Sequence, residues 1–317
     1  MKGDRRMAIK QTGCPSNAVE WVNKKIGEQK ELLRIEPLVG GTSSHLYEMD
    51  YSDGASTESC VLRLFTKTEW LAMEPDLADH EAASLLEAAK TGLAVPGMLA
   101  FDANGEQCGV PAVLMTKIEG SVVLQPDNEE EWLEELVAAL AKIHSHGAAG
   151  FQWEYFSYNQ NLSLERPAWS DHPAEWMQAF SIAHGAPPSA ESCFLHRDFH
   201  PANVLWEGKK VSGVVDWVNA CRGPAGVDVG HCRLNLAQLY GTETADRFLE
   251  AYTRHADNFS YRAYWDILAL TDILDGPPMV YPGWETFGMT GLTDELIRQR
   301  LDVYLLSLLS RFELEST

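Results

Sequence analysis

Basic residues are scarce in this chain of 317 residues, which has 25 Lys and Arg against 46 Asp and Glu and a formal net charge of −21. Nucleic acids and anionic membranes are bound through clusters of basic side chains, because contacts with phosphate dominate the affinity. We therefore expect neither a nucleic-acid partner nor a membrane partner. An acidic surface favours a neutral or cationic small ligand instead.

Long apolar runs and paired cysteine motifs are missing as well. No stretch reaches the roughly 20 consecutive apolar residues of a transmembrane helix, and residues 1–14 lack the apolar segment of a secretory signal. None of the six cysteines has the Cys-x-x-Cys spacing of a zinc ribbon or a redox site. We therefore expect free, mostly buried thiols and a cytoplasmic location.

The pattern of apolar residues divides the chain into two parts. Residues 1–118 read mostly as short strands separated by turns, with helical patterns over about 17–34 and 76–91. Residues 119–317 read as mostly helical and begin with an amphipathic helix over 128–146. Because strands and helices are segregated and do not alternate, the sequence predicts an α+β fold with two lobes.

A dense cluster of charged and apolar residues stands at 194–206, FLHRDFHPANVLW. Asn203 follows Asp198 by five positions, and Asp216 follows Asn203 by thirteen, at the end of an apolar run. An aspartate can accept a hydroxyl proton and orient a nucleophile, and the oxygens of Asn and Asp suit Mg²⁺ on nucleotide phosphates. The spacing therefore indicates phosphoryl transfer, with Asp198 as the catalytic residue and Asn203 and Asp216 as metal ligands.

The segments HRDFHPANVLW, VVDW and GPAGVDVGH resemble, in this order, the motifs of the aminoglycoside phosphotransferase and choline kinase-like family. The resemblance implies a bilobal protein-kinase-like fold, with an antiparallel sheet and one main helix in a nucleotide-binding lobe (1–118). The helical lobe (119–317) would then hold a catalytic loop at 196–203 and the acceptor site. It also implies ATP and Mg²⁺ as cofactors, and support of the catalytic loop by His196 and Asp228.

The same resemblance implies a nucleotide site in the β-rich lobe. Arg63 would contact phosphate where kinases have a lysine, and Glu81 would be its acidic partner, with Glu87 as a competing candidate. The remaining nucleotide-binding candidates are the phosphate-loop and hinge residues Gly40, Gly41, Thr42, Ser43, Ser44, Met115 and Lys117.

A small hydroxylated acceptor fits the sequence better than a protein acceptor. Asp-Trp-Val replaces the Asp-Phe-Gly of protein kinases, and Asp228 follows Asp216 by only 12 positions, which leaves no room for an activation loop. Acidic residues near aromatic ones, which would suit a cationic acceptor, are Asp272, Asp275 and Glu285. The sequence thus predicts a small-molecule kinase that transfers the γ-phosphate of ATP to a hydroxyl group.

Two alternatives remain open. One is a catalytically weak nucleotide-binding module on the same fold, against which the complete Asp, Asn and Asp set counts. The other is a metal-dependent hydrolase built on the H-x-D-x-H cluster, which leaves Asn203 and the glycine-rich turn without roles. That hydrolase would use His196, Asp198, His200, Asp216 and His231.

Overall fold

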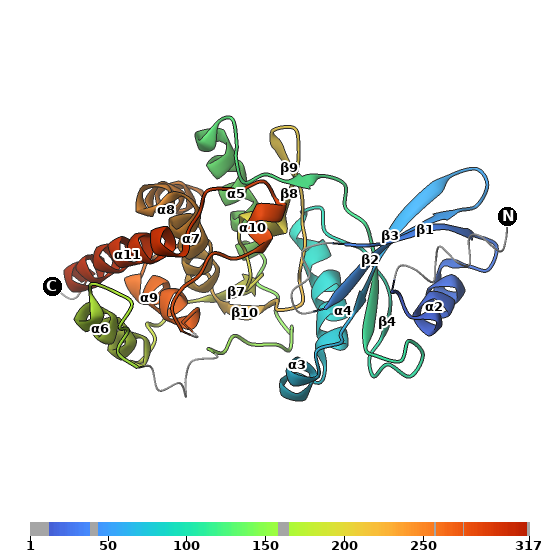
Figure 1. The fold of residues 1–317 in the computed structure, drawn as a ribbon, viewed down its shortest axis with the longest axis horizontal. Coiled ribbons are helices and arrows are strands. Elements are labelled where there is room, and N and C mark those ends of the chain that lie inside the picture. Colours follow the sequence, from blue (N-terminus) through green and yellow to red (C-terminus); the bar gives the residue numbers. More distant parts are fainter. Residues whose placement is uncertain (1–12, 39–43, 158–164, 257, 275, 316–317) are drawn as a thin grey trace. The chain divides into compact units, whose positions relative to one another are not determined.

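The chain forms two compact units in a computed structural model. The structure describes residues 13–38, 44–157, 165–256, 258–274 and 276–315. Unit 1 comprises Met1–Lys90, Ala94–Glu119 and Trp217–Asn219, and unit 2 comprises Thr91–Leu93, Gly120–Asp216 and Ala220–Thr317. Among the described residues, the large sheet belongs to unit 1 and most helices belong to unit 2 (Figure 1), so the predicted α+β segregation is confirmed.

Unit 1 is built on a five-stranded antiparallel sheet with the order β1-β2-β3-β5-β4. Its elements are α2 (Ser16–Ile26), β1 (Glu31–Pro37), β2 (His45–Ser52), β3 (Thr57–Leu64), α3 (Thr68–Met73), α4 (Leu77–Ala88), the 3₁₀ helix η1 (Ala89–Thr91), β4 (Met98–Asp102) and β5 (Ala112–Thr116). The strands alternate between two faces, because successive side chains of a strand point in opposite directions. In β3, Cys60, Leu62 and Leu64 join the core that α2 covers, which leaves Arg63 on the opposite face with α4.

The first helix is shorter than the pattern over 17–34 predicts. α2 ends at Ile26, and Gly27 follows it at φ 115, a backbone conformation that residues with a Cβ rarely adopt. From Glu31 the chain is already in β1, which pairs with β2 along its whole length. The ladder of hydrogen bonds thus overrides the helix-like spacing of the leucines in β1.

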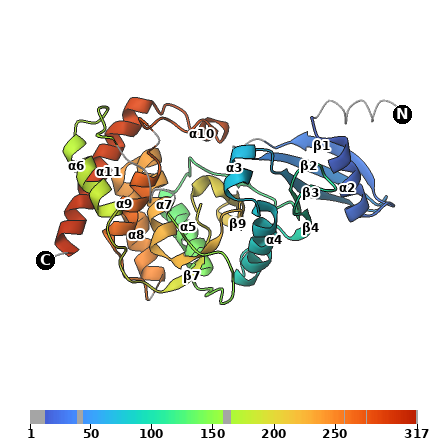
Figure 2. The same cartoon turned by 90° about the horizontal axis from the view of Figure 1, so that it is seen from below.

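Unit 2 is a helical bundle with two short sheets, β6-β8-β9 and β7-β10. Its helices are α5 (Glu129–His144), α6 (Pro173–Ala183), α7 (Gly226–Tyr240), α8 (Thr242–His255), α9 (Ala263–Asp272), α10 (Gly283–Thr286) and α11 (Asp294–Glu315). Its strands, with one 3₁₀ helix, are β6 (Ser121–Val122), β7 (Ser192–Leu195), η3 (Pro201–Asn203), β8 (Val204–Glu207), β9 (Lys210–Val214) and β10 (Cys221–Pro224). Helix α7 packs against α8, α9 and α11 (Figure 2). In the described part of the chain, none of the helices is both long and apolar enough to cross a membrane.

Two glycines let α7 lie very close to α9. A Cβ on Gly226 would come within 2.3 Å of the Trp265 ring, and a Cβ on Gly230 within 2.7 Å of the Trp265 carbonyl oxygen. Residues four apart share one face of a helix, so both glycines face the same partner. The crossing therefore fixes the first turns of α7, which carry residues of the site described below.

A buried ion pair joins the helices of this bundle. Arg233 of α7 has no exposed side-chain area and pairs with Asp266 of α9 and, at 2.6 Å, with Asp246 of α8. The hydroxyl groups of Tyr261 and Tyr304 lie 2.5 and 3.3 Å from the Asp266 carboxylate. Burial raises the pKa of Asp266 even though Arg233 opposes that shift. The network therefore ties the bundle together at a single guanidinium.

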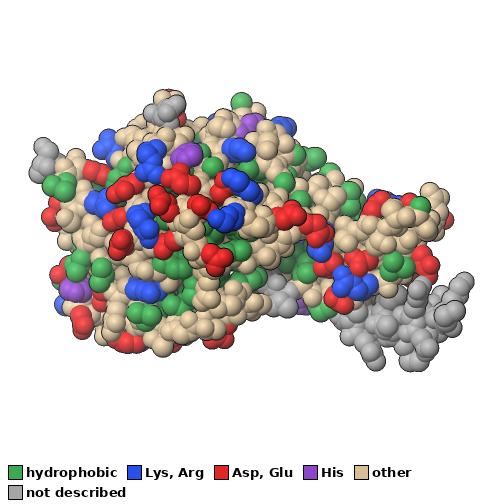
Figure 3. All heavy atoms as spheres, turned by 90° about the horizontal axis from the view of Figure 1, so that it is seen from above, with side chains coloured by type: hydrophobic (Ala, Val, Ile, Leu, Met, Phe, Trp, Pro, Cys, Tyr) green, Lys and Arg blue, Asp and Glu red, His purple; other side chains and the backbone are tan. Residues whose placement is uncertain are grey.

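Acidic and basic side chains are interspersed on the face of unit 2 drawn in Figure 3. Glutamates of α5 pair with basic residues elsewhere in the unit, including Glu131 with Lys209 at 2.8 Å and Glu135 with Lys210 at 2.5 Å. Glu134 pairs with His255 of α8 at 2.9 Å. Exposed pairs of this kind contribute only about 0–1 kcal/mol each, so they balance charge locally more than they stabilise the fold.

Candidate active site

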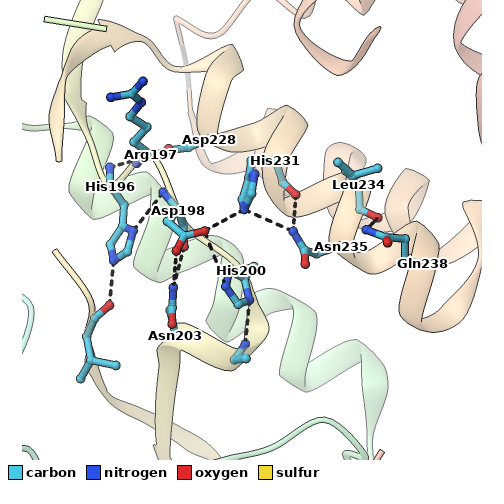
Figure 4. Close-up of polar contacts among 12 residues, drawn as sticks. His196, Arg197, Asp198, His200, Asn203, Asp228, His231, Leu234, Asn235 and Gln238 are labelled. Carbon is cyan, nitrogen blue, oxygen red and sulfur yellow. Dashed lines mark hydrogen bonds and ion pairs between the residues drawn. The ribbon is translucent and has the colours of Figure 1, made fainter. Parts of the chain in front are cut away.

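The loop after β7 is held by a buried carboxylate. Asp228 in the first turn of α7 accepts the backbone N–H groups of His196 and Arg197, both at 2.7 Å (Figure 4). The His144 ring lies 3.1 Å from the same carboxylate through Nε2, and the Tyr252 hydroxyl lies 2.6 Å from His144 Nδ1. Asp228 is fully buried, and a buried charge is tolerated because these donors satisfy it. Helices α5, α7 and α8 thus fix the backbone of the loop together.

His196 uses both of its ring nitrogens to hold the same loop. Its Nε2 lies 2.9 Å from the Val215 carbonyl oxygen, and its Nδ1 accepts the Asp198 backbone N–H at 3.3 Å. The proton therefore sits on Nε2. Because both nitrogens are engaged with backbone, His196 cannot also be a metal ligand.

Two residues, one in this loop and one shortly after β9, have a left-handed backbone conformation without being glycine. Arg197 has φ 67 and Asp216 has φ 68. Such conformations are uncommon for residues with side chains and cluster at functional sites, where surrounding contacts maintain them. For Arg197 those contacts include a hydrogen bond to the Phe156 carbonyl oxygen at 2.8 Å and a guanidinium placed 4.3 Å from the Phe156 ring centre.

The Asp198 carboxylate is surrounded by donors. Asn203 Nδ2 donates to its Oδ2 at 3.2 Å and to its backbone oxygen at 2.9 Å, and His231 Nε2 lies 3.0 Å from its Oδ1 (Figure 4). Burial raises the pKa of Asp198, but the nearby imidazoles of His200 and His231 outweigh burial and hold the pKa well below its usual range. Asp198 is therefore ionised at neutral pH, with 31% of its side chain exposed. It suits the orientation of a hydroxyl group better than strong base catalysis.

His200 faces the same carboxylate from a greater distance. Its Nε2 lies 3.7 Å from Asp198 Oδ1, and its Nδ1 accepts the Ala202 backbone N–H at 3.3 Å. Burial lowers the pKa of His200 to about 4, so the ring is neutral at physiological pH. The proton of the neutral ring then lies on Nε2 and points at Asp198.

Asn203 and Asp216 come together through the β8–β9 hairpin. Val204 pairs with Val214, and the Val215 N–H donates to the Asn203 carbonyl oxygen at 3.0 Å. Asp216 is the next residue, so it lies beside Asn203 at the end of the hairpin. Because the Asn203 amide nitrogen is bound to Asp198, the amide oxygen is left for a ligand. An amide oxygen and a carboxylate are the hard donors that Mg²⁺ prefers, so these residues fit that ion.

A second set of possible ligands fits a metal less well. Oxygen and nitrogen atoms of Asp198, His200 and His231 lie within 4.8 Å of one another, and a zinc-type ion binds such donors. A ligating histidine, however, normally donates its other ring N–H to an acceptor. In His200 the other nitrogen accepts an N–H from Ala202, which leaves the ligating position protonated. Three of the five residues that the hydrolase alternative requires thus cluster, but His196 and His200 lack the lone pairs it needs.

In unit 1, Arg63, which is predicted to contact phosphate, forms a buried pair with Glu81, its predicted partner. Arg63 lies 3.0 Å from Glu81, and their side chains are 6% and 1% exposed. Glu87, the competing candidate, pairs with Lys90 at 2.5 Å instead. A buried guanidinium of this kind is positioned by its carboxylate partner, as a phosphate-binding cation would need to be.

The other nucleotide-site candidates of unit 1 are less sharply placed. Met115 of β5 is buried and lies on the same face of the sheet as Arg63, because Val61 pairs with Met115 and Arg63 with Val113. The Lys117 ammonium is 3.1 Å from Glu48, and its backbone N–H donates to Ser59. Ser44 is buried just before β2. The positions Gly40, Gly41, Thr42 and Ser43 lie outside the described residues, and adenine binding by Met115 and Lys117 stays a prediction.

Of the candidates for acceptor binding, Asp272 has a described electrostatic link to the residues around Asp198. It ends α9, accepts the Ser157 hydroxyl at 3.4 Å, and its charge contributes to raising the pKa of His231. Glu285 is exposed on α10, and Asp275 lies outside the described residues. The aromatic residues around 151–176 are partly occupied in packing, as in the contact of Phe151 with Phe194 at 5.4 Å between ring centres.

The sequence motifs do not reveal the side chains that contact Asp198 and Asp228 in a kinase site. The sequence motifs give His231 a place only in the metal site of the hydrolase alternative, and they give no role to His144 or Tyr252. One signal was available for His231: in the segment D-V-G-H it follows Asp228 by three positions, which places both on one face of a helix. His144 and Tyr252 are distant in sequence, and only the packing of α5 and α8 reveals them.

Comparisons with known proteins identify the family. Residues 34–266 match the model of the phosphotransferase enzyme family, so the chain belongs to this family, as its motifs indicated. A homoserine kinase of Methylorubrum populi is 33% identical over 150 residues, which cover 42% of this chain and 45% of that protein. The chain thus matches less than half the length of this curated relative.

Solved structures show the same fold at low sequence identity. The macrolide 2'-phosphotransferase MphH from Brachybacterium faecium has a TM-score of 0.58 and 18% identity, over 81% of this chain and 88% of that one. A thermostable mutant of the aminoglycoside phosphotransferase APH(4)-Ia, in a ternary complex with ADP and hygromycin B, has a TM-score of 0.58 and 14% identity, over 91% and 97%. The predicted kinase-like phosphotransferase fold is therefore confirmed.

Proposed function

We propose that this protein is an ATP- and Mg²⁺-dependent kinase that transfers the γ-phosphate to a hydroxyl group of a small acceptor. The observation that carries the proposal is the joint placement of Asp198, Asn203 and Asp216. The side-chain amide of Asn203 donates to the Asp198 carboxylate. The backbone oxygen of Asn203 accepts the N–H of Val215, the residue just before Asp216. Membership of the phosphotransferase enzyme family supports the reaction class, and the ADP complex of APH(4)-Ia supports an adenine nucleotide.

Each residue has a defined task in this proposal. Asp198 orients the acceptor hydroxyl and receives its proton late, because its low pKa makes it a weak base. Asn203 and Asp216 would hold Mg²⁺, which neutralises charge on the phosphates when it is bound. In unit 1, Arg63 would contact the phosphates and Glu81 would orient it. Catalysis then rests on positioning and on charge stabilisation.

The acceptor is proposed to be small and hydroxylated, with a cationic group. The position of Asp272 supports this choice, because its carboxylate acts electrostatically on the catalytic cluster and would attract an ammonium group. The names of the relatives point to small hydroxylated acceptors of several kinds, which include homoserine and hygromycin B. The free thiols, most of which are buried, suit a cytoplasmic enzyme, which completes the proposal.

The test measures ADP release from ATP with and without Mg²⁺ over a panel containing homoserine, hygromycin B, a macrolide and choline. We expect one acceptor to stimulate release, and Asp198→Asn to abolish the stimulation. Glu134→Gln serves as the matched control, because it neutralises a carboxylate paired with a histidine at 2.9 Å on the surface of the same unit.

A wild-type level of stimulated release in Asp198→Asn would refute the catalytic assignment. ATP binding by calorimetry, without release on any acceptor, would instead support the weak nucleotide-binding module. Stoichiometric zinc in the purified protein would support the hydrolase alternative.

A further inference from the structure

Helix α7 contacts three successive residues of the catalytic loop. Asp228 accepts the backbone N–H groups of His196 and Arg197, and His231, one turn later on the same face, reaches the side chain of Asp198 (Figure 4). The first two contacts fix backbone. The third, 3.0 Å from His231 Nε2 to Asp198 Oδ1, acts on the catalytic carboxylate itself. One helix face therefore holds both the loop and its functional group.

We propose that His231 is a positioning residue for phosphoryl transfer: its Nε2–H holds the Asp198 carboxylate in the orientation that receives the acceptor hydroxyl. The inference rests on the kinase activity proposed above. The inference assigns a role to His231 that the family motifs do not include, since in the D-V-G-H segment those motifs assign a role to Asp228 alone.

The need for such a residue follows from the contacts of the carboxylate. Asn203 holds Oδ2 at 3.2 Å, and His231 holds Oδ1 at 3.0 Å. His200 lies 3.7 Å from Oδ1, which is too long for a hydrogen bond. Without His231 the carboxylate would be held at one oxygen only and could turn about its side-chain bonds. A loss of orientation at a reacting group is costly, because catalysis by positioning requires a narrow range of geometries.

The backbone of His231 is itself fixed. The preceding residue, Gly230, lies against the Trp265 carbonyl oxygen, where a Cβ would come within 2.7 Å. The Asn235 side chain donates to the His231 carbonyl oxygen at 3.0 Å. The imidazole, by contrast, keeps 27% of its area exposed and so does little to fill the core. A fixed backbone with a partly exposed ring fits a residue whose main task is to hold the Asp198 carboxylate and not to fill the core.

The charges that face His231 are mostly negative. They come from Asp198 in the catalytic loop, Asp228 on the same helix and Asp272 at the end of α9, while His200 faces it as a neutral ring. Although burial lowers it, the bond to Asp198 raises the pKa of His231 above its usual value. The stronger, charged form of the hydrogen bond therefore exists below that raised pKa and is lost as the pH rises through it.

The kinetic test compares three variants of the full chain with the acceptor that stimulates the wild type most. His231→Leu removes the donor, and we expect kcat to fall by roughly 10- to 100-fold, the worth of a hydrogen bond to a charged group, with KM for MgATP changed less than about twofold. In the wild type, kcat should fall as the pH rises through the pKa of His231, because the charged hydrogen bond is lost. His231→Gln keeps a donor that does not titrate, so it should recover most of kcat and should not show this alkaline fall. His255→Gln, in the surface pair with Glu134, should match the wild type.

A kcat in His231→Leu within about twofold of the wild type would overturn the proposal. Equal losses in the Leu and Gln variants at every pH would do the same, because they would indicate a packing role. Circular dichroism of each variant checks that the fold is kept.

A second measurement tests the pairing without relying on kinase activity. The ring resonances of His231 in nitrogen-15 NMR, assigned by their loss in His231→Gln, are titrated in the wild type and in Asp198→Asn. We expect the pKa of His231 to fall in Asp198→Asn, and an unchanged pKa would overturn the pairing. If the wild type transfers phosphate to no acceptor and releases no ADP, the proposed function fails, and the titration still decides whether His231 holds Asp198.

Discussion

Replacement of Arg233 by methionine should destabilise the helical unit far more than its single charge suggests. The guanidinium is fully buried and pairs with Asp266, whose side chain is only 1% exposed, and with Asp246. Methionine fills a similar volume but leaves the Asp266 carboxylate buried without its cation, with Tyr261 and Tyr304 as remaining donors. Removal of one partner of a buried pair costs about 3–5 kcal/mol, and we expect a loss of unfolding free energy in this range at pH 8.

The loss should depend on pH in a definite direction. Burial already raises the pKa of Asp266 above its ordinary value, and without Arg233 this pKa rises further. The folded state then binds a proton that the unfolded chain, with an ordinary pKa of about 3.9, has released. Stability therefore falls as the pH rises from about 4 through the folded pKa, so the penalty of Arg233→Met should be smaller at pH 5 than at pH 8.

Urea unfolding, followed by circular dichroism at both pH values, measures this penalty. Arg311→Met is the matched control, because Arg311 pairs with the same Asp246 at 2.8 Å but is 34% exposed, and we expect it to cost less than about 1 kcal/mol. The double variant Arg233→Met/Asp266→Asn should recover part of the loss. A penalty below about 1 kcal/mol, or one that does not change with pH, would refute the reasoning.

Three further outcomes can be measured on the same protein. Glu81→Gln should weaken MgATP binding in calorimetry by releasing Arg63 from its partner at 3.0 Å, and unchanged affinity would contradict the role of this pair. Asp216→Asn should raise the Mg²⁺ concentration needed for half-maximal ADP release, since an amide binds Mg²⁺ more weakly than a carboxylate, whereas an unchanged requirement would remove Asp216 from the metal site. The pKa of His200 is lowered to about 4, whereas its ordinary value is about 6.5. The unfolded chain therefore binds a proton more readily than the folded protein, and the free energy of unfolding falls as the pH drops from about 6.5 through 4. His200→Gln should therefore flatten the acid loss of stability in thermal melts, and an identical pH profile in variant and wild type would show that the ring does not contribute.

The family could be predicted because the motif that indicates it is local. Asp198, Asn203 and Asp216 lie within one loop and one hairpin, so their spacing in the sequence reflects their spacing in space. The α+β class was equally accessible, because strand and helix patterns are segregated along the chain. In each case a short-range pattern carries the information.

Long-range packing set the limit of prediction. The pattern over 17–34 has helical spacing, but pairing with β2 takes its second half into β1 after Gly27. The contacts of His144 with Asp228 and Tyr252 span 84 and 108 residues, and no local sequence pattern predicts them. The aromatic stretch near 151 illustrates the same limit, since composition does not distinguish a ligand-binding ring from a core ring such as Phe151.

The close crossing of α7 and α9 has a consequence for how proteins with this site can diversify. Helix α7 carries the residues that hold the catalytic loop, and α9 ends at Asp272 on the side proposed for the acceptor. Since a side chain at Gly226 or Gly230 would collide with Trp265, a shift of one helix moves the other. Acceptor range should therefore change through substitutions in the loops that follow α9, while changes inside the crossing would alter turnover for every acceptor alike.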